Sequence, residues 1–126
     1  MSICGIGIDI VEIIRIHTVI AKVGDRFAER ILSDTEFGQY KKNIKPELFL
    51  AKRFAVKEAT VKAFGIGMRG GLAFNQVETF HDNLGRPYLC LLKHAKVIAQ
   101  TLCLTRIHVT LSDEKKYACA MVILED

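Results

Sequence analysis

The sequence predicts an α+β fold in which a mainly antiparallel sheet packs against one long central helix. Three observations indicate it. Residues 3–13 alternate between two kinds of side chain with period two, as a strand does, and residues 46–64 show helical periodicity. Residues 77–124 contain four short strand-like segments and one helical segment. A chain of 126 residues is long enough for one core but not for two, so we expect a single domain spanning residues 1–126.

The N-terminal strand expected over residues 3–13 has two different faces. One face carries a run of isoleucines, and the other carries Asp9 beside Gly5 and Gly7. Asp9 either caps the turn that follows or presents its carboxylate in a cleft. Because the two glycines leave room beside this side chain, we favour the cleft.

Short helices are expected between this strand and the central helix. Residues 15–23 have helical spacing, Gly24 ends that helix, and Asp25 can start the next turn. The run Ser33-Asp34-Thr35-Glu36 matches a capping box, which predicts another helix start. Pro46 suits the first turn of the central helix, where its missing N–H does no harm.

The central helix carries charges in places where a structural helix would be apolar. Bulky apolar residues form one stripe along residues 46–64, and alanines at four-residue spacing form a second ridge, so the helix should be largely buried. Lys57 falls inside the bulky stripe, while Glu58 and Lys62 lie between the two faces. Buried charges need partners, a metal or a ligand.

The C-terminal half begins with a glycine-rich segment, residues 65–71, which either brings backbone N–H groups to a ligand or is a plain flexible connection. His108 lies on the polar side of a later strand, as a surface residue or as a donor to a phosphate. The expected elements after the loop are strands at 77–81 and 87–92, a helix at 93–103, a strand around 107–111 and a last strand at 117–124. The whole chain then reads β-α-α-α-α-β-β-α-β-β.

Charge and composition limit the possible partners. The net charge is only +4, yet residues 41–62 hold seven basic residues against two acidic ones, which suits a phosphate-bearing ligand or an acidic partner. No apolar run is long enough to span a bilayer, and no signal-peptide pattern is present, so we expect a cytoplasmic protein without membrane binding. The four cysteines lack Cys-x-x-Cys spacing; we expect no zinc site and reduced, buried thiols.

Two carboxylates that can converge, Asp9 from the strand and Glu58 from the helix, suit Mg²⁺, which prefers a few carboxylate oxygens plus water and substrate phosphates. Lys62, one turn from Glu58, can neutralise phosphate charge during phosphoryl transfer. The pattern favours a metal-assisted phosphate enzyme. Two alternatives remain: a non-catalytic module whose basic segment binds an acidic protein or nucleic acid, and a Mg²⁺-dependent nucleotide hydrolase.

Two motifs together resemble a known family. Residues 5–12 (Gly-Ile-Gly-Ile-Asp-Ile-Val-Glu) and residues 54–62 (Phe-Ala-Val-Lys-Glu-Ala-x-x-Lys) are similar to the signature pair of the 4′-phosphopantetheinyl transferases. The chain length, the glycine-rich loop and the closing His-Val-Thr-Leu-Ser…Tyr-Ala-Cys-Ala segment resemble the small, single-domain, homotrimeric subclass. The resemblance covers essentially the whole chain.

The resemblance implies that family's fold and its activity. The enzyme would transfer 4′-phosphopantetheine from coenzyme A to a serine of apo-acyl carrier protein, depend on Mg²⁺, release adenosine 3′,5′-bisphosphate, and serve fatty acid biosynthesis. Its partners would be coenzyme A, the carrier protein and further copies of itself, with active sites between subunits and no nucleic acid.

The resemblance also implies residue roles. Asp9 and Glu58 would hold Mg²⁺ and, with Lys62, form the catalytic set. Larger two-lobed members carry a third acid where this chain has Val11, so water or substrate would complete the metal shell. Either a metal-bound water or a carboxylate acting through water would accept the serine proton. The residues implied for coenzyme A binding are Arg53, Lys57, Lys62, Gly65 and His108, and those for carrier-protein binding are Arg15, Lys22, Arg26 and Phe27.

Overall fold

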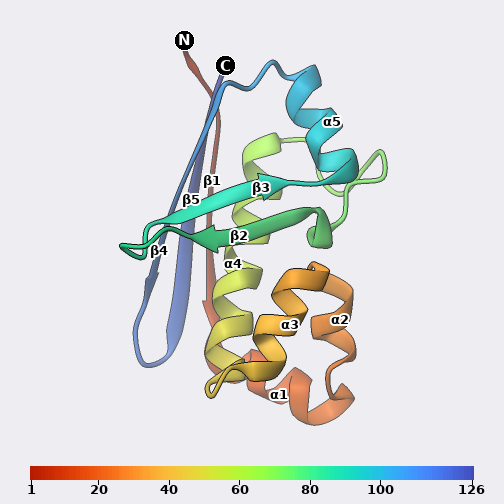
Figure 1. Ribbon diagram of the computed structural model, residues 1–126, viewed down its shortest axis with the longest axis vertical. Coiled ribbons are helices and arrows are strands. Elements are labelled where there is room, and N and C mark those ends of the chain that lie inside the picture. Colours follow the sequence, from red (N-terminus) through yellow and green to blue (C-terminus); the bar gives the residue numbers. More distant parts are fainter.

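A computed structural model describes all residues, 1–126, and confirms the predicted α+β fold and the order of its elements. Two antiparallel sheets lie against the long helix α4 (Figure 1). The elements are β1 (Ile3–Glu12), α1 (Ile13–Val23), α2 (Arg26–Ile31), α3 (Asp34–Lys42), α4 (Pro46–Phe64), a 3₁₀ turn η1 (Phe74–Gln76), β2 (Val77–His81), β3 (Pro87–Leu91), α5 (Lys93–Thr101), β4 (Arg106–Asp113) and β5 (Tyr117–Glu125).

The larger sheet has the strand order β1-β5-β4, and the hairpin β2–β3 forms a separate two-stranded sheet. Figure 1 shows the three long strands along one side of α4, the hairpin crossing α4, and α1 to α3 gathered at one end of the molecule. Asp9 pairs with Ala120 of the central strand β5. The helix α4 therefore lies between the sheet that carries Asp9 and the hairpin.

Close packing between β1 and α4 depends on two glycines. A Cβ atom on Gly7 would lie 1.9 Å from the carbonyl oxygen of Ala59, and one on Gly5 would lie 2.2 Å from that of Ala63. Both distances are far below contact, so the helix backbone approaches the strand only because no side chain is present. Asp9 follows on the same face of β1 and is thereby placed next to α4.

The helix α4 forms the centre of the core, as its two apolar sides predict. Eleven of its nineteen residues are buried. The alanine ridge faces the sheet, where the buried side chains of β5 contribute to the same core. The outer face of β1 is different, because Ile6, Ile8 and Ile10 are each more than half exposed.

Local signals at the helix ends act as predicted. The Ser33 hydroxyl accepts a hydrogen bond from the Glu36 N–H, and the Glu36 carboxylate accepts one from the Ser33 N–H, which completes the capping box. Pro46 stands in the first turn of α4, and Gly65 ends that helix with a φ of 74°, a left-handed conformation.

The prediction of buried thiols is wrong. Cys4 and Cys103 are exposed, and Cys90 and Cys119 are only partly buried; none forms a disulfide. Cys4 lies at the beginning of β1 and Cys103 just after α5, and the residues directly before each of them are exposed as well. No helix of the structure combines the length and the apolar character needed to cross a bilayer.

Candidate functional site

A groove of about 350 Å³ lies between β1, α1, α2 and α4 and contains the predicted catalytic residues. Asp9 enters it from β1, and Glu58 and Lys62 enter it from α4. The rest of the lining is Ile10, Val11, Glu12, Arg15, Ile16, Val19, Phe27 and Phe54. The structure thus brings Asp9 together with Glu58 and Lys62, which follow it about fifty residues later in the sequence.

Lys62 and Asp9 form an ion pair in this groove. The Lys62 ammonium lies 2.9 Å from Asp9 Oδ1 and also donates to the Ile8 carbonyl oxygen at 3.0 Å. The hydrogen bond to Asp9 raises the pKa of Lys62. The Lys62 side chain is 53% exposed, whereas that of Asp9 is 17% exposed, so the ammonium can meet a ligand from solvent.

Glu58 has no such partner. Burial raises the pKa of its carboxyl, and the negative charge of Asp9 raises it further, against the opposing effect of Lys62. Asp9 and Glu58, with the ammonium of Lys62 beside them, fit an additional cation. Glu12 also lines the groove, but no three His, Cys, Asp or Glu side chains gather as a metal site.

A second, basic recess of about 320 Å³ surrounds Arg53 on another side of α4. The Arg53 guanidinium lies 4.5 Å from the centre of the Phe49 ring, and its buried Nε forms an ion pair with Glu36 Oε2 at 3.4 Å. Burial lowers the pKa of His81, and the positive charges of Arg53 and Lys52 lower it further. The positive charges of Lys45, Lys52 and Arg53 around this recess fit a phosphate.

The remaining residues predicted to bind coenzyme A do not gather in one place within this chain. Gly65 is exposed at the C-terminal end of α4. His108 is exposed on β4 and contacts Glu125 of β5 through Nε2. Arg53 lies in the basic recess and Lys62 in the groove.

Lys57 points away from the groove. Its side chain is 0% exposed, and its ammonium donates to Glu36 at 2.7 Å, to the Phe74 carbonyl oxygen at 3.1 Å and to the Val77 carbonyl oxygen. These are all three donors that an ammonium has. The full use of its donors counts against the prediction that Lys57 contacts coenzyme A.

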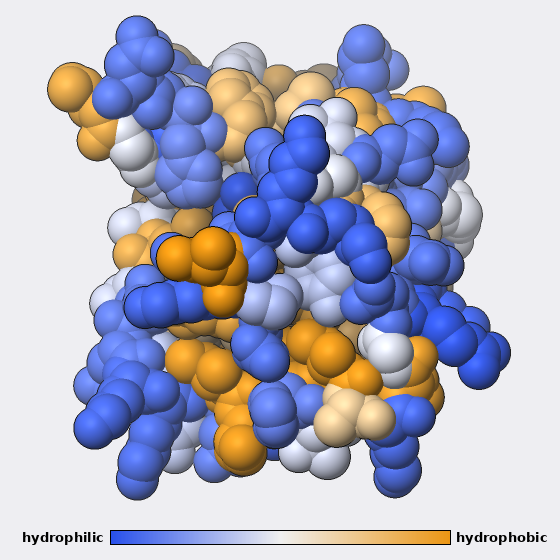
Figure 2. All heavy atoms as spheres, turned by 60° about the horizontal axis from the view of Figure 1, so that its bottom comes forward, coloured by the Kyte–Doolittle hydropathy of each residue, from blue (hydrophilic) through white to orange (hydrophobic).

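The residues predicted to bind the carrier protein lie together on α1 and α2. Arg15, Lys22 and Arg26 are exposed, and Phe27 is half buried against Phe54, with ring centres 5.3 Å apart. Figure 2 views the end of the molecule where these helices lie and shows hydrophobic residues with hydrophilic ones around them. A shallow recess there is lined by Val19, Val23, Arg26, Phe27 and Arg30.

Comparisons with known proteins decide the family. The family model described as "4'-phosphopantetheinyl transferase superfamily" matches residues 5–122. The chain belongs to this superfamily. It is 59% identical to the holo-[acyl-carrier-protein] synthase of Erwinia tasmaniensis over 125 residues, which are 99% of each chain.

Solved structures of the same family agree. The crystal structure of holo-[acyl-carrier-protein] synthase from Neisseria meningitidis superposes with a TM-score of 0.94 at 38% identity, covering 99% of this chain and 100% of that one. The Bacillus anthracis enzyme, in complex with CoA (3′,5′-ADP), has a TM-score of 0.79 at 35% identity and covers 98% and 97%. The predictions of the fold and of an enzyme of the holo-[acyl-carrier-protein] synthase type are confirmed.

The buried pair of Glu36 with Lys57 and the basic recess around Arg53 were not predicted from the sequence. Glu36 is recognised there only as part of a capping box, and its pairing with Lys57, 21 residues away, has no local signal. His81 and Phe49, which help to form the basic recess, look like ordinary strand and helix residues. A further hollow of about 630 Å³ beside Glu12, His17 and Glu47 contains none of the predicted site residues.

Proposed function

We propose that this phosphopantetheinyl transferase moves the 4′-phosphopantetheine group of coenzyme A to a serine of apo-acyl carrier protein with the help of Mg²⁺. It would release adenosine 3′,5′-bisphosphate, act in the cytoplasm and serve fatty acid biosynthesis, with residues 1–126 as one domain. The observation that carries the proposal is the meeting of Asp9, Glu58 and Lys62 in one groove. The chain that contains these three residues is 59% identical in sequence to a holo-[acyl-carrier-protein] synthase.

The groove supplies what the transfer requires. The serine oxygen forms a bond to the phosphorus that carries the pantetheine arm, and the bond from that phosphorus to the leaving bisphosphate breaks. Asp9 and Glu58 would hold the Mg²⁺, which when bound supplies positive charge to the diphosphate. Lys62, whose ammonium is half exposed, contacts the attacked phosphate and balances its charge.

The basic recess supports a place for a phosphate of coenzyme A. Arg53, Lys45 and Lys52 bring positive charge to this recess, and His81 lies in it as well. A phosphate bound there would be attracted by these charges, while Arg53 keeps its ion pair with Glu36 through Nε. Arg53 is therefore the strongest candidate among the predicted coenzyme A residues outside the groove.

The outer face of the larger sheet supports a homotrimer with active sites between subunits. Ile6 of β1 and His108 of β4 both pair with Ile123 of β5, so the three side chains share one face. The isoleucines of β1 on this face are exposed to an unusual extent for a monomer. Another copy that covers this face would bring His108 close to a subunit boundary, and Ile10, an exposed isoleucine of the same face, also lines the groove.

The exposed basic residues of α1 and α2 support binding of the acidic carrier protein. Phe27 lines the groove together with Arg15 and the neighbouring recess together with Arg26, and Lys22 is exposed on α1. Complementary charge speeds the encounter of two proteins, and an apolar residue between the charges fixes their contact. A carrier protein bound there would present its serine to Asp9, Glu58 and Lys62.

A mass-spectrometric assay tests the proposed function. The protein is incubated with apo-acyl carrier protein, coenzyme A and Mg²⁺, and the carrier protein is expected to gain one phosphopantetheine group. Chelation of divalent cations should abolish the gain, and re-addition of Mg²⁺ should restore it. An unchanged carrier-protein mass would contradict the proposal. Release of the bisphosphate without any acceptor protein would favour the nucleotide hydrolase instead.

A further inference from the structure

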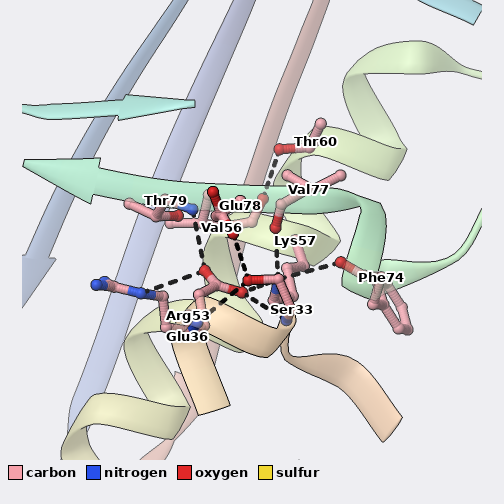
Figure 3. A network of polar contacts seen from close by, with 10 residues as sticks. All are labelled: Ser33, Glu36, Arg53, Val56, Lys57, Thr60, Phe74, Val77, Glu78 and Thr79. Carbon is pink, nitrogen blue, oxygen red and sulfur yellow. Dashed lines mark hydrogen bonds and ion pairs between the residues drawn. The ribbon is translucent and has the colours of Figure 1, made fainter. Parts of the chain in front are cut away.

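A buried cluster of polar groups joins α4 to α3 and to the hairpin (Figure 3). Its centre is the carboxylate of Glu36, which is 0% exposed. Oε1 accepts from the Ser33 N–H at 3.1 Å and from Lys57 Nζ at 2.7 Å, and Oε2 accepts from the Thr79 N–H at 2.9 Å. Oε2 also forms an ion pair with the buried Arg53 Nε at 3.4 Å. One side chain of α3 thus holds its own helix start, the helix α4 and the strand β2 together.

Lys57 completes the connection from the side of α4. Besides Glu36, its ammonium bonds to the carbonyl oxygens of Phe74 and Val77, at the beginning and just after the end of η1 (Figure 3). Its three donors point to three separate elements, and hydrogen bonds are directional. The position of Lys57 around the helix axis is therefore fixed more strictly than apolar packing alone would fix it.

The next residue on the helix is Glu58. Successive residues of an α-helix point about 100° apart, so a helix whose Lys57 faces α3 and the hairpin must turn Glu58 to another side. That side is the groove that also contains Asp9 and Lys62. The cluster and the groove thus lie on different sides of one rigid turn of α4.

We propose that Lys57 and Glu36 are a positioning pair for the transfer reaction: their buried ion pair fixes the rotation of α4 and so the places of Glu58 and Lys62 in the groove. The proposal rests on the function proposed above, because it assumes that Glu58 and Lys62 act there. Lys57 then acts through its neighbour and touches neither coenzyme A nor the carrier protein.

The burial of the pair is itself an argument for such a role. Removing two opposite charges from water costs about as much free energy as their attraction returns, and apolar side chains of similar volume often stabilise a core equally well. Neighbouring positions of α4, such as Val56 and Ala55, show that this helix can pack through apolar contacts. The charges of Lys57 and Glu36 therefore fix the orientation of α4 rather than stabilise the fold.

The experiment separates positioning from stability. Lys57→Met leaves Glu36 with Arg53 as its one buried cation, and Glu36→Gln leaves Lys57 and Arg53 without their carboxylate, so each should lower the melting temperature. The double variant removes the charges of Lys57 and Glu36 but keeps that of Arg53, and it should recover part of the loss seen in Glu36→Gln. Turnover is measured with the carrier-protein assay at saturating coenzyme A and carrier protein, below each melting temperature. We expect the kcat of the folded double variant to stay at least ~10-fold below that of the natural protein.

A matched control uses Thr60, another fully buried polar residue of α4, whose hydroxyl donates only to the Val56 carbonyl oxygen at 2.7 Å within the same helix. Thr60→Val should leave kcat unchanged. Lys57→Gln, which keeps a donor for the carbonyl oxygens, serves as a second neutral variant should the double variant not fold.

The possible outcomes are distinct. A folded double variant with the natural kcat would mean that the pair contributes to stability alone, and it would overturn the proposal. The proposal is also overturned if neither the double variant nor Lys57→Gln folds. Glu58→Gln is measured beside them. Its inactivity together with a fully active double variant overturns only the positioning role, whereas full activity of Glu58→Gln overturns the proposed function itself.

Discussion

Lys57 and Glu58 are neighbours in the sequence, yet the structure treats their charges in opposite ways. The ammonium of Lys57 is fully buried and uses every donor, while the carboxylate of Glu58 is partly buried, lies near Asp9 and is disfavoured in its ionised form. A charge whose partners are complete belongs to the framework of the protein. A charge held in an unfavourable place, with solvent access, is available for chemistry.

The largest effect on activity is expected on the side of α4 that faces the groove. Asp9→Asn and Glu58→Gln each remove one of the two carboxylates proposed to hold Mg²⁺, so each should lower kcat/KM at least ~100-fold, the upper range seen for groups that merely support a metal ligand. Steady-state kinetics with the carrier-protein assay measure this. Glu47→Gln, in the first turn of the same helix but outside the groove, is the matched control and should retain the natural rate. A near-natural rate in either carboxylate variant would contradict the metal role.

The next largest effect concerns how closely β1 approaches α4. In Gly7→Ala the new Cβ would lie 1.9 Å from the Ala59 carbonyl oxygen, so strand and helix must separate. Overpacking of this kind costs about 1–3 kcal/mol of unfolding free energy, or more. Chemical denaturation measures it. Gly38→Ala is the control: Gly38 lies inside α3 with open space around it, and alanine there should stabilise the protein by about 0.5–1 kcal/mol. Equal stability of Gly7→Ala and the natural protein would refute the close contact.

The smallest expected effect is a pH-dependent change in melting temperature caused by the Glu58 carboxyl group. The pKa of Glu58 in the folded protein is raised above its ordinary 4.5, so folding disfavours the ionised carboxylate and the natural protein loses stability as the pH rises through that range. Glu58→Gln carries no charge and should melt slightly higher than the natural protein at pH 7. Near pH 4, where Glu58 is largely protonated in both states, the difference should disappear. The gain is small because the side chain is partly solvated. A lower melting temperature of Glu58→Gln at pH 7 would contradict this account.

Much of the fold could be predicted because its signals are local. The alternation in β1, the capping box at Ser33 and Glu36, and Pro46 and Gly65 at the ends of α4 each act within a few residues, and all have the expected result. The placement of Asp9 next to α4 follows from the same alternation, since it shares a face with Gly5 and Gly7.

The partner of Lys57 could not be predicted in this way. The sequence shows that a lysine in an apolar stripe needs a partner, but the choice of Glu36 depends on how α3 packs against α4 and on which carbonyl groups η1 leaves free. The basic recess around Arg53 depends likewise on β2 lying beside α4, which brings His81 to it. Contacts between elements distant in the sequence arise only from tertiary packing.

The contact of Gly5 and Gly7 with α4 has a consequence for anyone who would transplant this site into another protein scaffold. The distance from Asp9 to Glu58 is set by how closely two backbones meet, and this depends on residues that take no part in the reaction. A grafted Asp, Glu and Lys on a strand and helix of ordinary spacing would be held too far apart. The smallest transferable unit therefore includes the two glycines of the strand and the alanines they touch, Ala59 and Ala63.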